Sequence, residues 1–115
     1  MLKSLVNYIK ENGGATYNLN SNNYMESGFM CAKAENEYII DGQVTVEHLQ
    51  NYITKYGKDL QKENANLGAW YNTENGKTYL DTSFRFENLQ DAVEFGRKNN
   101  QLAIFNLNTF EEYRL

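Results

Sequence analysis

The sequence has no proline and only one cysteine, one histidine and one tryptophan among its 115 residues. With Cys31 as its single cysteine the chain cannot form an intrachain disulfide framework, so a reduced, cytoplasmic setting is expected. No apolar run approaches the roughly 20 residues that span a bilayer. The first residues also lack the apolar core and the small-residue cleavage site of a secretory signal.

Basic residues are also scarce: 11 Lys and Arg stand against 15 Asp and Glu, for a net charge of −4. The isoelectric point is near 5.0. Nucleic-acid binders carry basic patches and usually an isoelectric point above about 9. Direct nucleic-acid binding is therefore not expected.

Aromatic residues, by contrast, are abundant, with nine Tyr, six Phe and one Trp. Disordered chains are poor in such residues. The length is typical of one domain, and 41% hydrophobic residues suffice for a modest core. Residues 1–115 are therefore predicted to form a single globular domain.

Three amphipathic helices are predicted, over residues 2–12, 46–60 and 88–99. In each segment apolar side chains recur at intervals of three and four residues. Thr45 directly precedes the second segment, and Asn88 begins the third. Their side chains are suited to accept from unpaired backbone amides at a helix N-terminus, so both are predicted N-caps.

Two β-hairpins are predicted from runs of strand-forming residues bounded by turn residues. The first joins residues 28–34 to residues 37–40 through a tight turn at Glu35 and Asn36. The second spans residues 67–86 and turns at Asn75-Gly76, where both residues can adopt a positive φ.

Two further strands are predicted at residues 15–19 and 102–107, and residues 108–115 are expected to be a short helical turn or a tail. Because a helix precedes the 102–107 strand, parallel pairing with a hairpin strand is one possible arrangement. The order α-β-β-β-α-β-β-α-β predicts an α+β fold, with a mostly antiparallel sheet and about three helices packed on it.

Candidate catalytic residues are few. A Cys–His nucleophile would require Cys31 and His48 to meet, yet Cys31 lies in an apolar strand and His48 in the first turn of a helix. One Cys and one His do not form a zinc ligand set, and no calcium loop or glycine-rich phosphate loop is present. No metal and no cofactor are expected. Tyr79, Asp81 and Arg85 share one face of a predicted strand, where they form either a binding or acid–base site or a solvated ion pair.

An acidic segment covers residues 24–54, where five carboxylates stand against one basic residue, a local charge of −4. Such a block can complement a basic groove and speed association, although many charge runs are only solvated surface. Tyrosine is enriched at interface hot spots. Several of the tyrosines that stand beside Asn or acidic residues are expected to be partly exposed: Tyr8, Tyr17, Tyr24, Tyr38 and Tyr52. The predicted partner-binding residues are Glu26, Glu35, Glu37, Asp41, Glu47, Tyr24 and Tyr38.

Three motifs occupy the C-terminal half: Gly68-Ala69-Trp70-Tyr71, then Gly76-x-x-Tyr79-Leu80-Asp81-x-Ser83, then Gln101-Leu102-Ala103-Ile104-Phe105-Asn106-Leu107. Through them, residues 67–107 resemble a group of small proteins from phages, plasmids and integrated mobile elements. The shared residues describe a hairpin, a capped helix and a strand, and they include no catalytic residues.

In size, acidity and composition the chain also resembles type II anti-CRISPR proteins. That resemblance implies a non-enzymatic inhibitor, in the cytoplasm of a bacterial host, that binds Cas9 and blocks guide RNA or DNA. Two alternatives stay open. One is a mobile-element accessory protein without a defence role, with a homodimer as one form. The other is a small hydrolase or nuclease that uses the Tyr79, Asp81 and Arg85 face.

Overall fold

The computed structural model describes residues 2–101 and 103–115, so Leu102, which was predicted to open the last strand, lies outside the described residues. The three predicted helices are confirmed as α1 (Leu2–Asn12), α2 (Val46–Leu60) and α3 (Leu89–Lys98). Thr45 and Asn88 cap α2 and α3 as predicted, since each side chain accepts a backbone N–H of the first turn.

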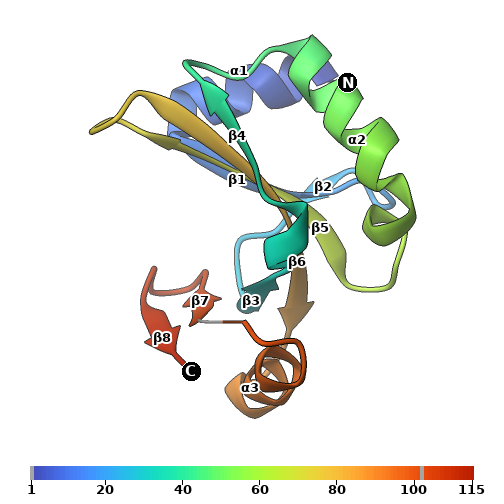
Figure 1. Cartoon of the computed structure of the whole chain (residues 1–115), viewed down its shortest axis with the longest axis vertical. Coiled ribbons are helices and arrows are strands. Elements are labelled where there is room, and N and C mark those ends of the chain that lie inside the picture. The colour runs from blue at the N-terminus through green and yellow to red at the C-terminus, as the bar shows by residue number, and fades with distance from the viewer. Residues whose placement is uncertain (1, 102) are drawn as a thin grey trace.

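The described residues also form eight strands and one 3-10 turn, η1. They are β1 (Gly14–Asn18), β2 (Asn23–Tyr24), β3 (Phe29–Ala32), η1 (Ala34–Asn36), β4 (Tyr38–Asp41), β5 (Ala65–Asn72), β6 (Lys77–Phe86), β7 (Ala103–Asn106) and β8 (Glu112–Arg114). All strands belong to one sheet, ordered β2-β1-β5-β6-β3-β7-β8, with β4 also paired to β6 (Figure 1). The α+β class and the mostly antiparallel sheet are thereby confirmed.

The predicted hairpin over residues 28–40 does not form. Instead, β3 and β4 both pair antiparallel with β6, β3 against residues 83–86 and β4 against residues 77–80. The ten residues of β6 offer room for two short strands placed end to end. The chain between them forms η1, which carries it along β6 without reversing its direction.

The second hairpin, β5–β6, is confirmed, but its turn is longer than predicted. The last cross-strand pair is Asn72 with Lys77, so the loop comprises residues 73–76. Gly76 adopts a positive φ of 70°, whereas Asn75 does not. The Asn75 side chain instead accepts the N–H of Lys77 at 2.9 Å, which stabilises the loop in a different way.

The C-terminal strands also differ from the prediction. β7 pairs antiparallel with β3 rather than parallel with a hairpin strand, and residues 112–114 form β8 against β7. The reversal between them depends on Phe110, which has a positive φ of 61° and donates its N–H to the Asn106 carbonyl at 2.7 Å.

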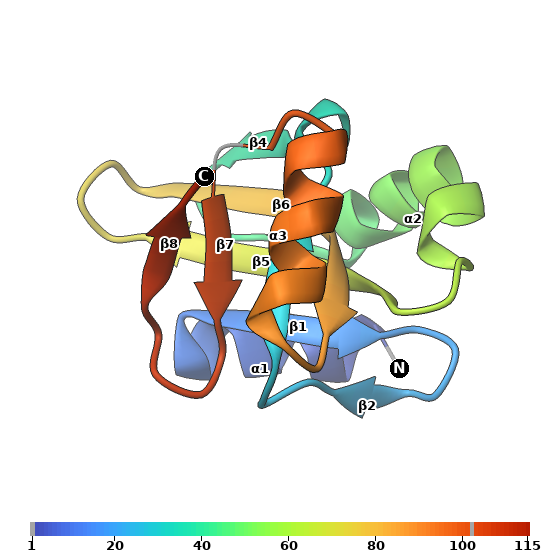
Figure 2. The same cartoon turned by 90° about the horizontal axis from the view of Figure 1, so that it is seen from below.

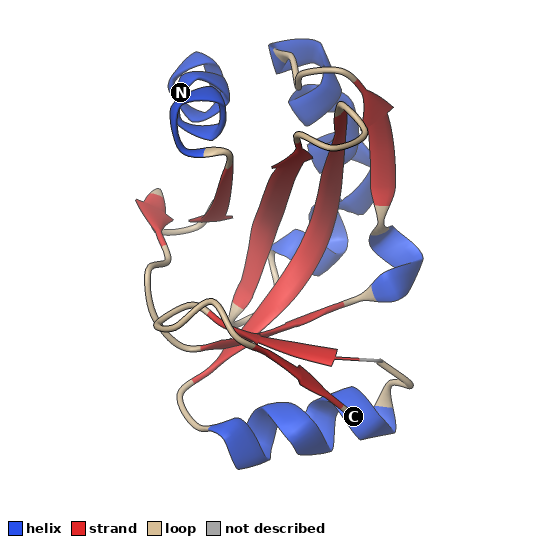
Figure 3. Ribbon diagram, turned by 90° about the vertical axis from the view of Figure 1, so that its left-hand side faces the viewer, coloured by secondary structure: helices blue, strands red, loops and turns tan. Residues whose placement is uncertain are grey.

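The helices pack at the two ends of the strongly twisted sheet, α1 and α2 at one end and α3 at the other (Figure 3). Two hydrophobic clusters lie beneath them, and the strand register places both clusters on the same face of the sheet. The larger lies between α1, α2 and the β1–β5–β6 part of the sheet, and the smaller lies under α3. Of the five tyrosines considered for exposure, Tyr17 and Tyr52 are buried in the larger cluster at 5% and 3% exposure, whereas Tyr8, Tyr24 and Tyr38 are at least partly exposed. The Tyr52 hydroxyl donates to the Asn36 carbonyl at 2.8 Å, and burial raises its pKa.

A polar network joins η1 to the end of α2. The Asp59 carboxylate accepts from Lys33 Nζ at 3.0 Å, Lys62 Nζ at 2.9 Å and Asn36 Nδ2 at 2.9 Å. These three donors hold the pKa of Asp59 well below its usual range. The network therefore ties the β3–β4 connection to the helix that follows it.

The Asp59 network predicts a pH-dependent stability. Because the pKa of Asp59 is lower in the folded chain, its contribution is complete above the unfolded pKa of about 3.9 and is lost as the pH falls below it. Asp59→Asn should lower the free energy of unfolding at pH 7 by about 1–3 kcal/mol. Urea titrations should show the difference from wild type shrinking below about pH 4. A difference that stays constant with pH would contradict the ionic network, and exposed Glu74→Gln serves as the control.

Candidate functional site

The sheet leaves one face without helical cover. Side chains alternate along β6, and the helices pack on the face that carries Leu80 and Phe84. The opposite face has no described helix against it at the hairpin end, as Figure 2 shows. We define this "open sheet face" by Ile39 of β4, Tyr79 and Asp81 of β6, and Gly68 and Trp70 of β5.

An apolar strip crosses the open sheet face. The strand register places Ile39 opposite Tyr79, and Tyr79 opposite Trp70. The rings of Trp70 and Tyr79 are stacked, with centroids 5.6 Å apart and an interplanar angle of 29°. Trp70 is 56% exposed and Ile39 is 49% exposed. Three neighbouring strands thus present a continuous apolar surface to solvent.

Asp81 lies beside this strip in an unusual environment. Its carboxylate occupies the space that a Cβ at Gly68 would fill, directly against the neighbouring strand. Ser83 Oγ donates to Asp81 Oδ1 at 2.6 Å. Burial raises the pKa of Asp81, and the negative charge of Glu37 raises it further. None of the ion pairs between described residues includes Asp81, so no cation of the chain offsets the effect of burial on its charged form.

Tyr79, Asp81 and Arg85 share this face as predicted, but their functional groups have separate partners. The Tyr79 hydroxyl accepts from Asn75 Nδ2 at 2.7 Å, and Asp81 accepts from Ser83. The Nε–H of Arg85 donates to the Ser27 carbonyl at 2.7 Å, and this bond fixes the segment before β3 against β6. The geometry therefore does not assemble an acid–base site from the three.

Part of the predicted acidic surface gathers around β4. Glu35 lies in η1, Glu37 follows it directly, and Asp41 ends β4. All three side chains are exposed. Tyr38, at the start of β4, is 47% exposed, as predicted. The three carboxylates form an acidic border around β4, next to the apolar strip, whereas Tyr38 lies opposite Leu80 on the helix-covered face.

The other predicted partner-binding residues lie on different elements. Glu26 is exposed in the connection between β2 and β3, and Glu47 is exposed in the first turn of α2. Tyr24 of β2 is half-buried and stacks on Tyr8 of α1 with centroids 3.8 Å apart. The predicted set is thus divided between the β4 border and sites elsewhere.

Cys31 and His48 are not brought together. Cys31 lies at 0% exposure in the cluster under α3, where burial raises the pKa of its thiol to about 11. His48 belongs to the cap of α2, where its Nδ1 accepts the N–H of Thr45 at 3.0 Å. A protonated, buried thiol is not a nucleophile. Residues 2–101 and 103–115 contain no group of three or more potential metal ligands.

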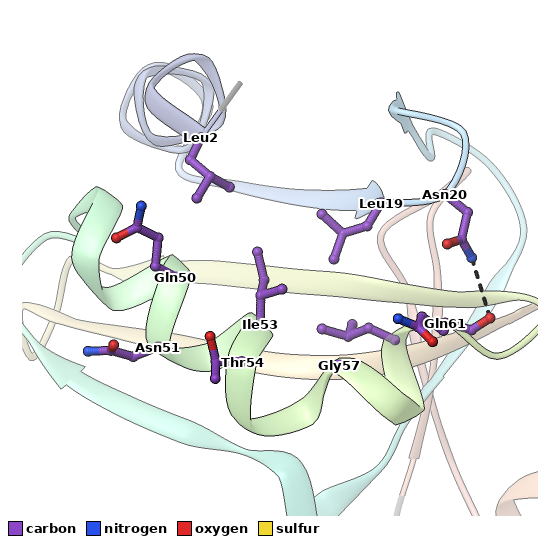
Figure 4. A pocket seen from close by; sticks show the side chains of 10 residues that line it. Leu2, Leu19, Asn20, Gln50, Asn51, Ile53, Thr54, Gly57 and Gln61 are labelled. Atoms are coloured by element: carbon purple, nitrogen blue, oxygen red, sulfur yellow. Dashed lines mark hydrogen bonds between the residues drawn. The ribbon is translucent and has the colours of Figure 1, made fainter.

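A shallow groove of about 710 Å³ lies between α1, the turn after β1, and α2 (Figure 4). Leu2, Leu19 and Ile53 converge in it. The side chain of Asn20 closes one end by donating to the Gln61 carbonyl at 3.5 Å. Its other polar lining side chains are carboxamides and one hydroxyl. The groove therefore offers no titratable group for acid–base chemistry.

Sequence reasoning missed Trp70 and Ile39, which dominate the exposed apolar surface. For Trp70 a signal was present: it alternates with Leu67 and Ala69, both buried, and so points to the opposite face of β5. The position of Ile39 depends on the pairing of β4 with β6, which has no local signal.

No helix in the described ranges is long and apolar enough to cross a membrane. Comparisons of the chain with models of protein families, with curated proteins and with solved structures give no match. Function must therefore be argued from the open sheet face itself.

Proposed function

We propose that the protein is a non-enzymatic inhibitor or adaptor that binds another protein through its open sheet face. The observation that carries this proposal is the apolar strip. The only tryptophan of the chain is 56% exposed there and stacks on Tyr79. Trp and Tyr are enriched in the hot spots of protein interfaces, and contiguous exposed apolar surface marks interaction sites.

The charges around the strip favour a basic partner surface. Glu37 lies close enough for its negative charge to raise the pKa of the buried Asp81, and Glu35 and Asp41 are exposed at either end of the β4 segment. Complementary charge steers two proteins together and selects among partners. The guanidinium group of a partner arginine could also stack on the exposed ring of Trp70 in a cation–π contact.

The specific partner in this proposal is Cas9, whose channels hold guide RNA and DNA against basic protein surface. An acidic, aromatic protein seated in such a channel would exclude the nucleic acid. The choice of Cas9 rests on the resemblance of residues 67–107 to mobile-element proteins and of the whole chain to type II anti-CRISPR proteins. The enzyme alternative has less support, because Tyr79, Asp81 and Arg85 are each engaged separately.

A triple charge reversal tests this function. Changing Glu35, Glu37 and Asp41 to Lys moves the local charge of residues 24–54 from −4 to +2, since each reversal adds two. Association with Cas9 should slow by about tenfold or more at low salt. The effect should fade as salt rises, because exposed charges are screened beyond about 8 Å at physiological ionic strength. Stopped-flow association rates at two salt concentrations measure both.

The matched control reverses Glu26, Glu47 and Glu94, which are exposed but lie away from β4. Surface changes of this kind usually alter stability little, so both variants should remain folded. Equal slowing in the two variants would mean that net charge alone acts, and it would contradict binding at the β4 border. Failure of the wild-type chain to bind Cas9 would overturn Cas9 as the partner.

A further inference from the structure

The free edge of β4 is the second feature of the open sheet face. Among described residues β4 pairs only with β6, and it lies at the outer border of the sheet (Figures 1 and 2). The N–H of Gly42 donates to the Gly76 carbonyl at 2.8 Å. Along two antiparallel strands, residue pairs that are joined by backbone hydrogen bonds alternate with pairs that are not. Tyr38 and Ile40 therefore bond to β6, while the backbone groups of Ile39 and Asp41 point away from the sheet.

This edge has little of the usual protection against strand addition, because β4 carries no proline and no lysine, although it is only four residues long and ends at the charged Asp41. Natural edge strands carry proline, lysine or a bulge, or are very short. β4 has the sequence Tyr-Ile-Ile-Asp, and its two exposed apolar side chains, Tyr38 and Ile39, are 47% and 49% exposed. The outer strands at the ends of the sheet are better protected, because β2 has only two residues and β8 carries Glu112 and Arg114.

We propose that the free edge of β4 receives an extended basic segment of the partner protein as an added strand. This inference rests on the function proposed above and specifies how the partner binds. Backbone bonds to Ile39 and Asp41 would provide affinity, as in other cases of strand addition. Successive side chains alternate between the faces, so Glu37, Ile39 and Asp41 share one of them.

That alternation defines the partner segment. Side chains directly opposite each other on neighbouring strands interact most strongly, and opposite charges are favourable there. The segment should therefore carry a basic residue, then an apolar residue two positions later, then a second basic residue two positions after that. Lys77 approaches Asp41 at 3.7 Å, but the Asp41 side chain remains 92% exposed and available.

A second copy of this chain fits the edge less well. If two β4 strands paired antiparallel about Ile39, Glu37 of one copy would lie opposite Asp41 of the other. Like charges directly opposite each other destabilise a strand pair. Charge therefore favours a basic segment of another protein over a homodimer.

The probe is the acetylated and amidated peptide Ser-Arg-Thr-Val-Thr-Arg-Ser, and its control replaces both Arg residues with Glu. The Arg peptide should bind and slow hydrogen exchange at the amides of Ile39 and Asp41 by about tenfold or more at saturation, as measured by NMR. The Glu peptide should do neither. Failure of the Arg peptide to bind at millimolar concentration would overturn the proposal, as would protection elsewhere in the chain.

Ile39→Pro provides the variant, because it removes an outward N–H while leaving the bonds of Tyr38 and Ile40 to β6 intact. The variant should lower the affinity for the Arg peptide by about tenfold or more, which corresponds to about 1.4 kcal/mol of binding free energy. Ile39→Val should retain the wild-type affinity. If Ile39→Pro does not fold, two backbone-methylated Arg peptides are used instead of the variant. One carries N-methyl groups on the amides that would face β4, and the other carries them on the amides that would face away. Only the first modification should weaken binding. Equal binding of both methylated peptides would refute strand addition.

Two outcomes separate this inference from the proposed function. If Trp70→Ala abolishes Cas9 binding while Ile39→Pro preserves it, the open sheet face binds the partner without strand addition. If the wild-type chain alone forms dimers with protected Ile39 and Asp41 amides, a second copy occupies the edge and the proposed occupant is wrong.

Discussion

Replacing Trp70 with alanine is expected to weaken Cas9 binding by about 30-fold or more, which corresponds to a hot-spot loss of about 2 kcal/mol. The melting temperature should stay close to that of wild type, because more than half of the side chain is already exposed at 56%. Titration calorimetry and a thermal melt of the same sample measure the two quantities. Trp70→Phe should retain part of the affinity, since a phenyl ring can still stack on Tyr79.

Phe110→Ala is the matched control for Trp70. Phe110 is 74% exposed in the turn before β8, and its nearest aromatic neighbour is Phe105. Its truncation should leave Cas9 affinity unchanged. Equal losses from Trp70→Ala and Phe110→Ala would show that exposed aromatic area in general drives binding, and the apolar strip would lose its assigned role.

Leu49→Ala is expected to lower the free energy of unfolding by about 2–5 kcal/mol, because it leaves a cavity in the larger core. Leu49 is 0% exposed within that core. Ile53→Ala, one turn later on α2, should cost only about 1 kcal/mol. Ile53 is half-buried and lines the groove of Figure 4, so water can fill the space left by the truncation.

Urea titrations with a common m-value would measure this contrast. If Leu49→Ala and Ile53→Ala lowered the free energy of unfolding equally, α2 would not bury Leu49 more deeply than Ile53, contrary to the structure. The comparison therefore tests whether the groove between α1 and α2 is open in solution, independently of any function.

Local interactions explain which elements could be predicted. Helical hydrogen bonds join residues four apart, and caps such as Thr45 and Asn88 act within three residues. The β5–β6 hairpin also joins neighbours in the chain. The helices, their N-terminal boundaries and this hairpin therefore follow from short stretches of sequence.

The candidate site was only partly predictable for the same reason. Tyr79, Asp81, Glu37 and Asp41 could be selected from residue type and alternation. Which of them meet depends on pairing between distant segments, as when Tyr38 lies opposite Leu80. Composition showed an acidic, aromatic chain, but it did not show that the carboxylates around β4 border an exposed tryptophan.

Short-range patterns were thus sufficient for the helices, the α+β class and the two faces of β6. The long-range register decided that β3 and β4 share β6 end to end, that Tyr17 and Tyr52 are buried, and that Ile39, Tyr79 and Trp70 form one strip. The physical reason is that a strand has no internal hydrogen bonds to specify its partner. The partner and register of a strand are selected by how much apolar side-chain area the whole sheet then buries. That area depends on segments far apart in the sequence, so it is defined only in the folded chain.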